Sequence, residues 1–132
     1  MIKNIEANNC LGIWMDHSIA NLMAYNDLIN GHTIELAFTY LNKMAALHHS
    51  ESGMHHKEQQ LQEAYYKQIG AEILKYDSVL LFGPTKAKNE LHNYLKKDHH
   101  FNEIQFEIQN VDKMTKNEQR AFVKNYFTKR LQ

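Results

Sequence analysis

The sequence predicts an α/β domain in which helices pack on a mixed five-stranded sheet. Apolar residues alternate with period two, or run continuously, in several short segments, which is typical of strands. They recur every three to four residues in longer segments, which is typical of amphipathic helices. The segments follow the order β-β-β-α-β-α-β-α. A chain of 132 residues with 43% apolar residues fits one domain over residues 1–132.

The first three segments are predicted to be antiparallel strands. Residues 11–15 and 19–25 favour strand structure, and the polar residues 16–18 between them form a turn. Asn26-Asp27 and Asn30-Gly31 mark the next connection, and Asn-Gly is a strong turn signal. Residues 32–40 then alternate strictly, and the positions that share one face are Ile34, Leu36, Phe38 and Tyr40.

The middle of the chain changes from period two to helical spacing. Over residues 57–75 the apolar positions are four apart, at Leu61, Tyr65, Ile69 and Ile73. Residues 78–82 are almost continuously apolar and predict a central strand buried on both faces. Gly83-Pro84-Thr85 ends that strand, and a second helix follows through Leu91 and Leu95.

The end of the chain predicts a fifth strand and a third helix. Ile104, Phe106 and Ile108 alternate within residues 101–111. Thr115 and Glu118 have the spacing of a capping box, so the last helix is predicted over residues 116–130 with Val123 and Phe127 buried. Right-handed crossovers would make the later strands parallel.

Charge and cysteine content exclude several protein classes. The 15 basic residues equal the 15 acidic ones, so the chain is not a polybasic protein that coats nucleic acid with its whole surface. The single cysteine, Cys10, excludes an internal disulfide and a multi-cysteine metal site, and we expect it to be a buried apolar residue. No segment has the length of a signal peptide core or a membrane span. A cytoplasmic protein that has no membrane partner is the expectation.

Three segments resemble one bacterial family described as translational machinery proteins. Those proteins are single-domain relatives of the middle domain of the eukaryotic and archaeal class-one peptide-chain release factor and of Pelota. The resemblance implies a ribonuclease-H-like fold. The matching segments are Gly12-Ile13-Trp14-Met15-Asp16-His17, Leu81-Phe82-Gly83-Pro84-Thr85-Lys86-Ala87-Lys88-Asn89-Glu90-Leu91 and Val111-Asp112-Lys113-Met114-Thr115.

The resemblance does not extend to the hydrolytic motif of the release factor. In that factor a Gly-Gly-Gln loop, between the third strand and the first helix, positions a water against the peptidyl-tRNA ester. The equivalent residues 48–60 contain one glycine and no adjacent glycine pair. We therefore expect no catalytic residues and a pattern closer to Pelota, in which the ester is not hydrolysed.

A histidine-rich segment occupies the place of that loop. We expect a loop that contacts RNA through His48, His49, Gly53, His55, His56 and Lys57. Imidazoles are also common metal ligands, so a divalent metal is the alternative, although adjacent histidines point in different directions. A solvated loop without a special role is the third interpretation. We expect no metal and no cofactor.

Two further sets of residues are candidates for anion contacts. Lys116, Arg120 and Lys124 are four residues apart on the last helix and form a basic stripe that could follow a phosphate backbone. A solvated helix face is the plainer explanation. Gly83, Thr85, Lys86 and Lys88 join a strand to a helix amino terminus, where free N–H groups attract anions. A purely structural turn is the alternative there.

The leading functional hypothesis is a non-catalytic, translation-factor-like domain that binds the ribosome or another RNA. The first alternative is a metal-assisted hydrolase that acts on RNA or on a tRNA ester, with Asp16, Glu58 or Glu63 as ligands. Asp16 more often stabilises a turn. The second alternative is a protein-interaction module, which includes a homo-oligomer formed through an exposed sheet edge. Trp14 is expected in the core.

Overall fold

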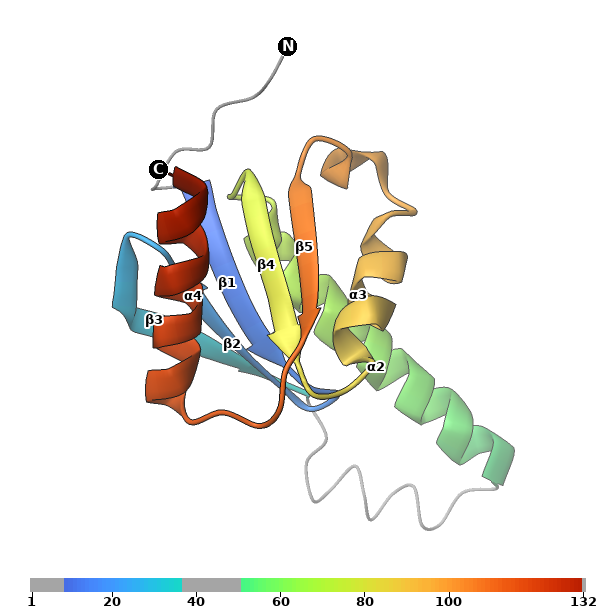
Figure 1. The fold of residues 1–132 in the computed structure, drawn as a ribbon. Helices are drawn as coiled ribbons and strands as arrows, with labels where there is room; N and C mark the ends of the chain where they lie inside the picture. Colours follow the sequence, from blue (N-terminus) through green and yellow to red (C-terminus); the bar gives the residue numbers. More distant parts are fainter. Residues whose placement is uncertain (1–8, 37–50, 132) are drawn as a thin grey trace.

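The computed structural model describes residues 9–36 and 51–131, with side chains described from residue 57 in the second range. These residues form an α/β domain with one five-stranded mixed sheet, three α-helices and a short 3-10 helix (Figure 1). The elements are β1 (Cys10–Met15), β2 (Ile19–Ala24), β3 (Asp27–Glu35), α2 (Glu51–Ile73), β4 (Ser78–Gly83), α3 (Ala87–Leu95), η2 (His99–Phe101), β5 (Gln105–Asn110) and α4 (Lys116–Leu131).

The sheet has the strand order β3-β2-β1-β4-β5. β1 pairs antiparallel with β2 and parallel with β4, while β3 and β5 are the edge strands. Every residue of β1 and of β4 is buried. The prediction of a central strand buried on both faces is therefore confirmed.

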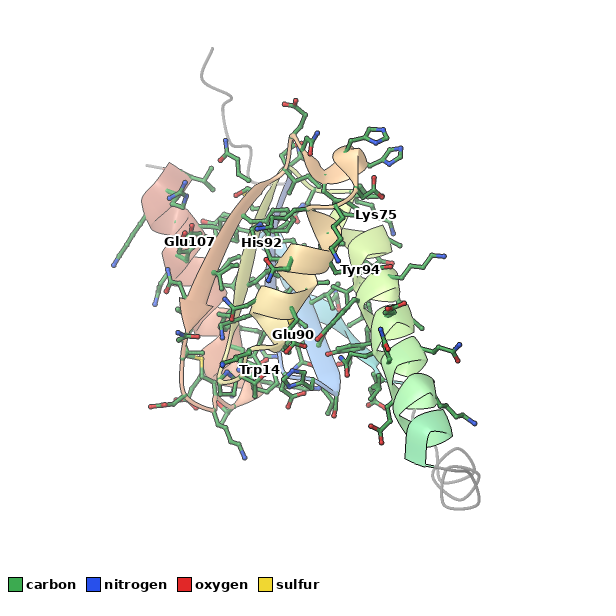
Figure 2. All side chains as sticks on the ribbon, turned by 90° about the vertical axis from the view of Figure 1, so that its right-hand side faces the viewer. Trp14, Lys75, Glu90, His92, Tyr94 and Glu107 are labelled. Atoms are coloured by element: carbon green, nitrogen blue, oxygen red, sulfur yellow. The ribbon has the colours of Figure 1, made fainter. Side chains whose placement is uncertain are left out.

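Helices cover both faces of the sheet. α4 lies on one face, and α2 and α3 lie on the other (Figures 1 and 2). Side chains of β1 alternate between the two layers: Leu11 and Ile13 pack with α2 and α3, and Cys10 and Trp14 pack with α4. The expected core positions of Cys10 and Trp14 are confirmed.

Gly12 allows α4 to lie directly on the backbone of β1. A Cβ atom at this position would lie 2.3 Å from Cγ2 and 2.7 Å from Cγ1 of Val123 on α4. Val123 itself is fully buried. The absence of a side chain at residue 12 therefore sets the distance between this helix and the sheet.

The predicted helix faces and the predicted capping box are confirmed. Tyr65, Ile69 and Ile73 of α2 are buried, as are Leu91 and Leu95 of α3 and Val123 and Phe127 of α4, while Leu61 of α2 is half-buried. At the start of α4 the backbone N–H of Glu118 donates to Thr115 Oγ1 at 3.1 Å. The backbone N–H of Thr115 donates to Glu118 Oε1 at 2.9 Å. These two bonds form a reciprocal capping box.

Of the two positions predicted to mark the connection between β2 and β3, the turn lies near the first, Asn26-Asp27, and the turn expected at Asn30-Gly31 is wrong. The chain turns at residues 25–26, and residues 30 and 31 lie within β3. The pairing of β2 with β3 is irregular between Leu22 and Ala24. A Cβ at Gly31 would lie 2.5 Å from the carbonyl oxygen of Leu22, so this glycine serves a close strand contact at the irregularity. Of the four predicted inward positions, Phe38 and Tyr40 lie outside the described residues.

Candidate functional site

The predicted basic stripe lies on α4 beside the line where that helix meets the sheet. Lys116 and Lys124 are exposed, and Arg120 is half-buried. The buried positions of the helix are Gln119, Val123 and Phe127, and the first two each come one residue before a member of the stripe, Arg120 and Lys124. The three cations therefore follow the edge of the helix–sheet contact rather than the outermost face of the helix.

A groove runs between this stripe and the β2–β3 hairpin. It consists of two adjoining hollows that share Leu28, Ile29 and Arg120, and we call it the α4–β3 groove. Lys116 lines the first hollow and Lys124 the second. The other residues that line the two hollows are Asn21, Leu22, Met23, Tyr25, Asn26, Asp27, Gly31, His32, Thr33, Gln119 and Ala121.

Hydrogen bonds made by side chains fix the polar wall of the α4–β3 groove. Asn21 Nδ2 donates to Gln119 Oε1 at 3.0 Å, and Thr33 Oγ1 donates to Asn21 Oδ1 at 2.8 Å. Gln119 Nε2 donates to the carbonyl oxygen of Met114 at 3.0 Å. Because these bonds connect β2, β3 and α4, the groove keeps its shape without a ligand.

The charge of the α4–β3 groove is positive. Lys116, Arg120 and Lys124 line it, and among the residues that the structure describes the only carboxylate beside them is that of Asp27. That carboxylate accepts a hydrogen bond from Asn30 Nδ2 at 3.1 Å. The guanidinium of Arg120 donates to Asn117 Oδ1, which holds it along the helix. Three cations on one fixed wall can bind an anionic polymer through several phosphates at once.

The structure describes only part of the predicted histidine-rich loop. His48 and His49 lie outside the described residues. Gly53, His55 and His56 lie in the first turns of α2, which begins at Glu51, so the prediction of a loop there is wrong for the backbone of residues 51–57. One glycine costs a helix only about 1 kcal/mol, which the surrounding helix-forming residues offset.

The amino-terminal turns of α2 extend beyond the sheet. Figure 1 shows its amino-terminal turns projecting past the end of the sheet. Among the side chains described on this helix, Tyr65 is the first that is buried, and Lys57 is partly exposed. Glu58, Leu61 and Gln62 line a hollow with residues of the β1–β2 turn, so the arm consists of residues 51–57 and is about 10 Å long at 1.5 Å per residue.

The turn between β4 and α3 places the two lysines of the predicted anion site differently. Lys86 is exposed. Lys88 is fully buried, and its Nζ donates to the carbonyl oxygen of Thr85 at 2.5 Å. Thr85 Oγ1 accepts from the backbone N–H of Ala87 at 3.2 Å. Gly83 is buried. Of the four residues, Lys88 therefore supports the structure of the turn and does not face solvent.

Replacing Lys88 with methionine is expected to stabilise the protein by about 1 kcal/mol at pH 7. Burial lowers the pKa of Lys88 below its ordinary value of 10.5. At pH values between the lowered pKa of the folded protein and 10.5, the unfolded chain binds more protons than the folded one. In this range the wild type therefore becomes more stable as the pH rises. The advantage of Lys88→Met should therefore shrink as the pH approaches 10.5. Urea unfolding at pH 7, 8.5 and 9.5 measures this, with the exposed Lys86→Met as the matched control. If Lys88→Met were less stable than the wild type by the same amount at all three pH values, the assignment of Lys88 as a buried cation with a lowered pKa would be contradicted.

A cluster that spacing did not predict joins α2, α3 and the β1–β2 turn. His17 Nε2 lies 3.2 Å from both carboxylate oxygens of Glu90, and Tyr66 Oη donates to Glu90 Oε1 at 2.8 Å. Burial opposes ionisation of Glu90, but the hydrogen bonds from Tyr66 and His17 outweigh it and lower its pKa. Burial and the bond to Glu90 raise the pKa of Tyr66, so it remains a donor. Glu90 lies on α3, where Figure 2 labels it.

The hydrogen bonds of this cluster hold α2 against the β1–β2 turn. Tyr65 Oη donates to the carbonyl oxygen of Asp16 at 3.0 Å, and Gln62 Nε2 donates to that of His17 at 3.2 Å. The carboxylate of Asp16 accepts from the backbone N–H groups of Ser18 and Ile19, each at 2.8 Å. With these two bonds Asp16 stabilises the β1–β2 turn, which was the plainer interpretation of this residue. His17 and Glu90 are 73 positions apart, so no local pattern could have paired them.

No protein-family model and no curated protein matches the chain. No helix in the described part of the chain has the length and apolar character needed to cross a membrane.

Proposed function

We propose that this chain is a non-catalytic RNA-binding domain that associates with the ribosome, and that the α4–β3 groove contacts the phosphate backbone. The observation that carries the proposal is the line of Lys116, Arg120 and Lys124 along one wall of that groove. Four helical residues advance about 6 Å, so the three cations span about 12 Å. This length suits contacts with successive phosphates of one strand.

The groove also offers the other groups that a polynucleotide backbone uses. Thr33 and the exposed His32 lie on its β3 side, and a guanidinium such as that of Arg120 can bind a phosphate through two parallel hydrogen bonds. Contacts of this kind position a protein on RNA without reading the base sequence. We therefore expect binding that depends on backbone charge more than on base identity.

The arm of α2 supplies a second contact in this proposal. β1, β4 and β5 are parallel, and α4 begins after the carboxyl end of β5. The arm projects from that same end of the sheet (Figure 1). One RNA could therefore contact both the start of α4 and the arm that carries Gly53, His55, His56 and Lys57.

The proposed family supports the same function. Three antiparallel strands followed by two parallel ones, in the order β3-β2-β1-β4-β5, suit a ribonuclease-H-like domain of the kind in the release factor and Pelota. The missing Gly-Gly-Gln sequence favours a binding role over ester hydrolysis. Association with ribosomes would place the protein in the cytoplasm.

The salt dependence of RNA binding tests the proposal. For single strands, log K falls by about 0.7 per log unit of salt for each phosphate neutralised, so three contacts predict a slope of about −2. Fluorescence anisotropy with a labelled single-stranded RNA between 50 and 200 mM KCl measures it. In parallel, the protein should sediment with ribosomes at low salt and leave the pellet at high salt. A slope near zero, or absence from the low-salt pellet, would contradict the proposal.

A further inference from the structure

Two histidines and one aspartate gather in a short segment between α3 and β5. One ligand atom from each of Asp98, His99 and His100 can be chosen so that all three lie within 4.8 Å of one another. All three residues are exposed. The described residues hold no other group of three such side chains at this distance.

The backbone of this segment is fixed by hydrogen bonds and by one buried anchor. The N–H of Asp98 donates to the carbonyl oxygen of Leu95 at 3.0 Å, and the N–H of Phe101 donates to that of Asp98 at 3.2 Å. Phe101 is buried and packs in the core with α2 and α3. A ligand-binding segment held this way loses little conformational entropy when it binds.

The side chains of Asp98, His99 and His100 lie close together. His100 Nδ1 lies 2.6 Å from Asp98 Oδ1, which also accepts the backbone N–H of His100 at 2.9 Å. The rings of His99 and His100 have centroids 4.2 Å apart and planes inclined by 30°.

We propose that Asp98, His99 and His100 bind one divalent transition-metal ion, with Zn²⁺ as the ion that their donors suit best. Imidazole nitrogen and carboxylate oxygen are both zinc ligands, at about 2.0–2.2 Å. Tetrahedral coordination puts ligand atoms roughly 3.3 Å apart, so small side-chain rotations would close the site. Three protein ligands leave a fourth position for water or for a donor group of another molecule.

The proposed zinc site is independent of the α4–β3 groove. η2 precedes the amino end of β5, whereas the stripe begins after the carboxyl end of that strand. The residues that line the groove are also different ones. Zinc binding and RNA binding can therefore fail separately.

Zinc titration against a chromophoric chelator tests the site. The protein should carry no affinity tag, and His48, His49, His55 and His56 should be alanine so that the other histidine-rich segment does not compete. In this background we expect one zinc per chain. His99→Ala and His100→Ala should each lower the affinity at least tenfold, and the matched control His32→Ala, an exposed histidine on β3, should leave it unchanged.

A second readout separates coordination from loss of folding. Zinc at about one hundred times its Kd should raise the melting temperature of the background protein, because a ligand that binds only the folded state stabilises it. The double variant His99→Ala/His100→Ala should melt at the same temperature with and without zinc. Unchanged zinc affinity in both single variants, or no binding in the background protein, would overturn the proposal.

Discussion

Replacing Gly12 with alanine is expected to lower the free energy of unfolding by about 2–3 kcal/mol. The added methyl group would lie 2.3 Å from Val123 Cγ2, and both residues lie in a fully packed contact between β1 and α4. Overpacking of a buried contact typically costs about 1–3 kcal/mol. Urea unfolding of the single variant measures the loss.

A compensating substitution distinguishes this contact from a general effect of alanine at residue 12. In Gly12→Ala/Val123→Ala the two methyl groups of Val123 that the new side chain meets are removed. The remaining distance, from the new Cβ to Cβ of residue 123, is 3.1 Å, which a small shift of α4 relieves. We expect the double variant to be at least as stable as Gly12→Ala alone. Strictly additive losses would contradict the contact.

Replacing Gly83 with alanine is expected to cost about 3–4 kcal/mol. The new Cβ would lie 2.1 Å from the carbonyl oxygen of Met15, and the φ angle of Gly83 is +158°, which other residues rarely adopt. The clash is with backbone, so no truncation of a neighbouring side chain can relieve it. Strain of this kind and overpacking each cost about 1–3 kcal/mol.

Gly70→Ala is the matched control for Gly83→Ala. Its new Cβ would meet the end of a side chain, Leu95 Cδ2, at 2.8 Å, and alanine is the better helix former by about 1 kcal/mol. We expect a net change of less than about 1 kcal/mol. Equal losses in the two variants, by thermal or urea unfolding, would show that the backbone contact at Gly83 is not what matters.

The sequence predicts the core of this fold well because its strongest patterns are local. The four-residue spacing of Tyr65, Ile69 and Ile73 marks the buried face of α2, and the apolar run of β4 marks a strand covered on both sides. The capping box of Thr115 and Glu118 fixes the start of α4 to the residue. Each of these signals depends on neighbours within one or two turns of chain.

The errors arise at glycines and polar residues, which occur both in turns and inside regular elements. Asn30-Gly31 has the composition of a hairpin turn. In the structure residue 31 must instead be glycine because its backbone lies close to the carbonyl oxygen of Leu22, across an irregular strand pair. Gly53 and the polar residues around it suggested a loop, yet helix α2 continues through them. A residue type that serves two structural purposes cannot reveal which one applies without knowledge of its partner.

In the candidate site too, the sequence predicts the part formed by neighbouring residues and not the part formed by distant segments. The spacing of Lys116, Arg120 and Lys124 predicts one helical stripe, whereas the opposite wall of the groove comes from β2 and β3, about ninety positions away. The burial of Lys88 and the cluster around Glu90 also depend on distant segments, and neither was predicted. Local periodicity can therefore identify one side of a groove but not the surface that completes it.

The affinity for RNA of a charge-reversed stripe tests the central proposal most directly. The variant Lys116→Glu/Arg120→Glu/Lys124→Glu is compared with Lys67→Glu/Lys96→Glu/Lys97→Glu, which changes net charge equally at three exposed positions on α2 and at the end of α3. Melting curves first establish that both variants fold. At 150 mM KCl the stripe variant should bind single-stranded RNA at least one hundredfold more weakly than the wild type, and the control variant less than threefold more weakly. Wild-type affinity in the stripe variant, or equal losses in both, would contradict binding through the α4–β3 groove.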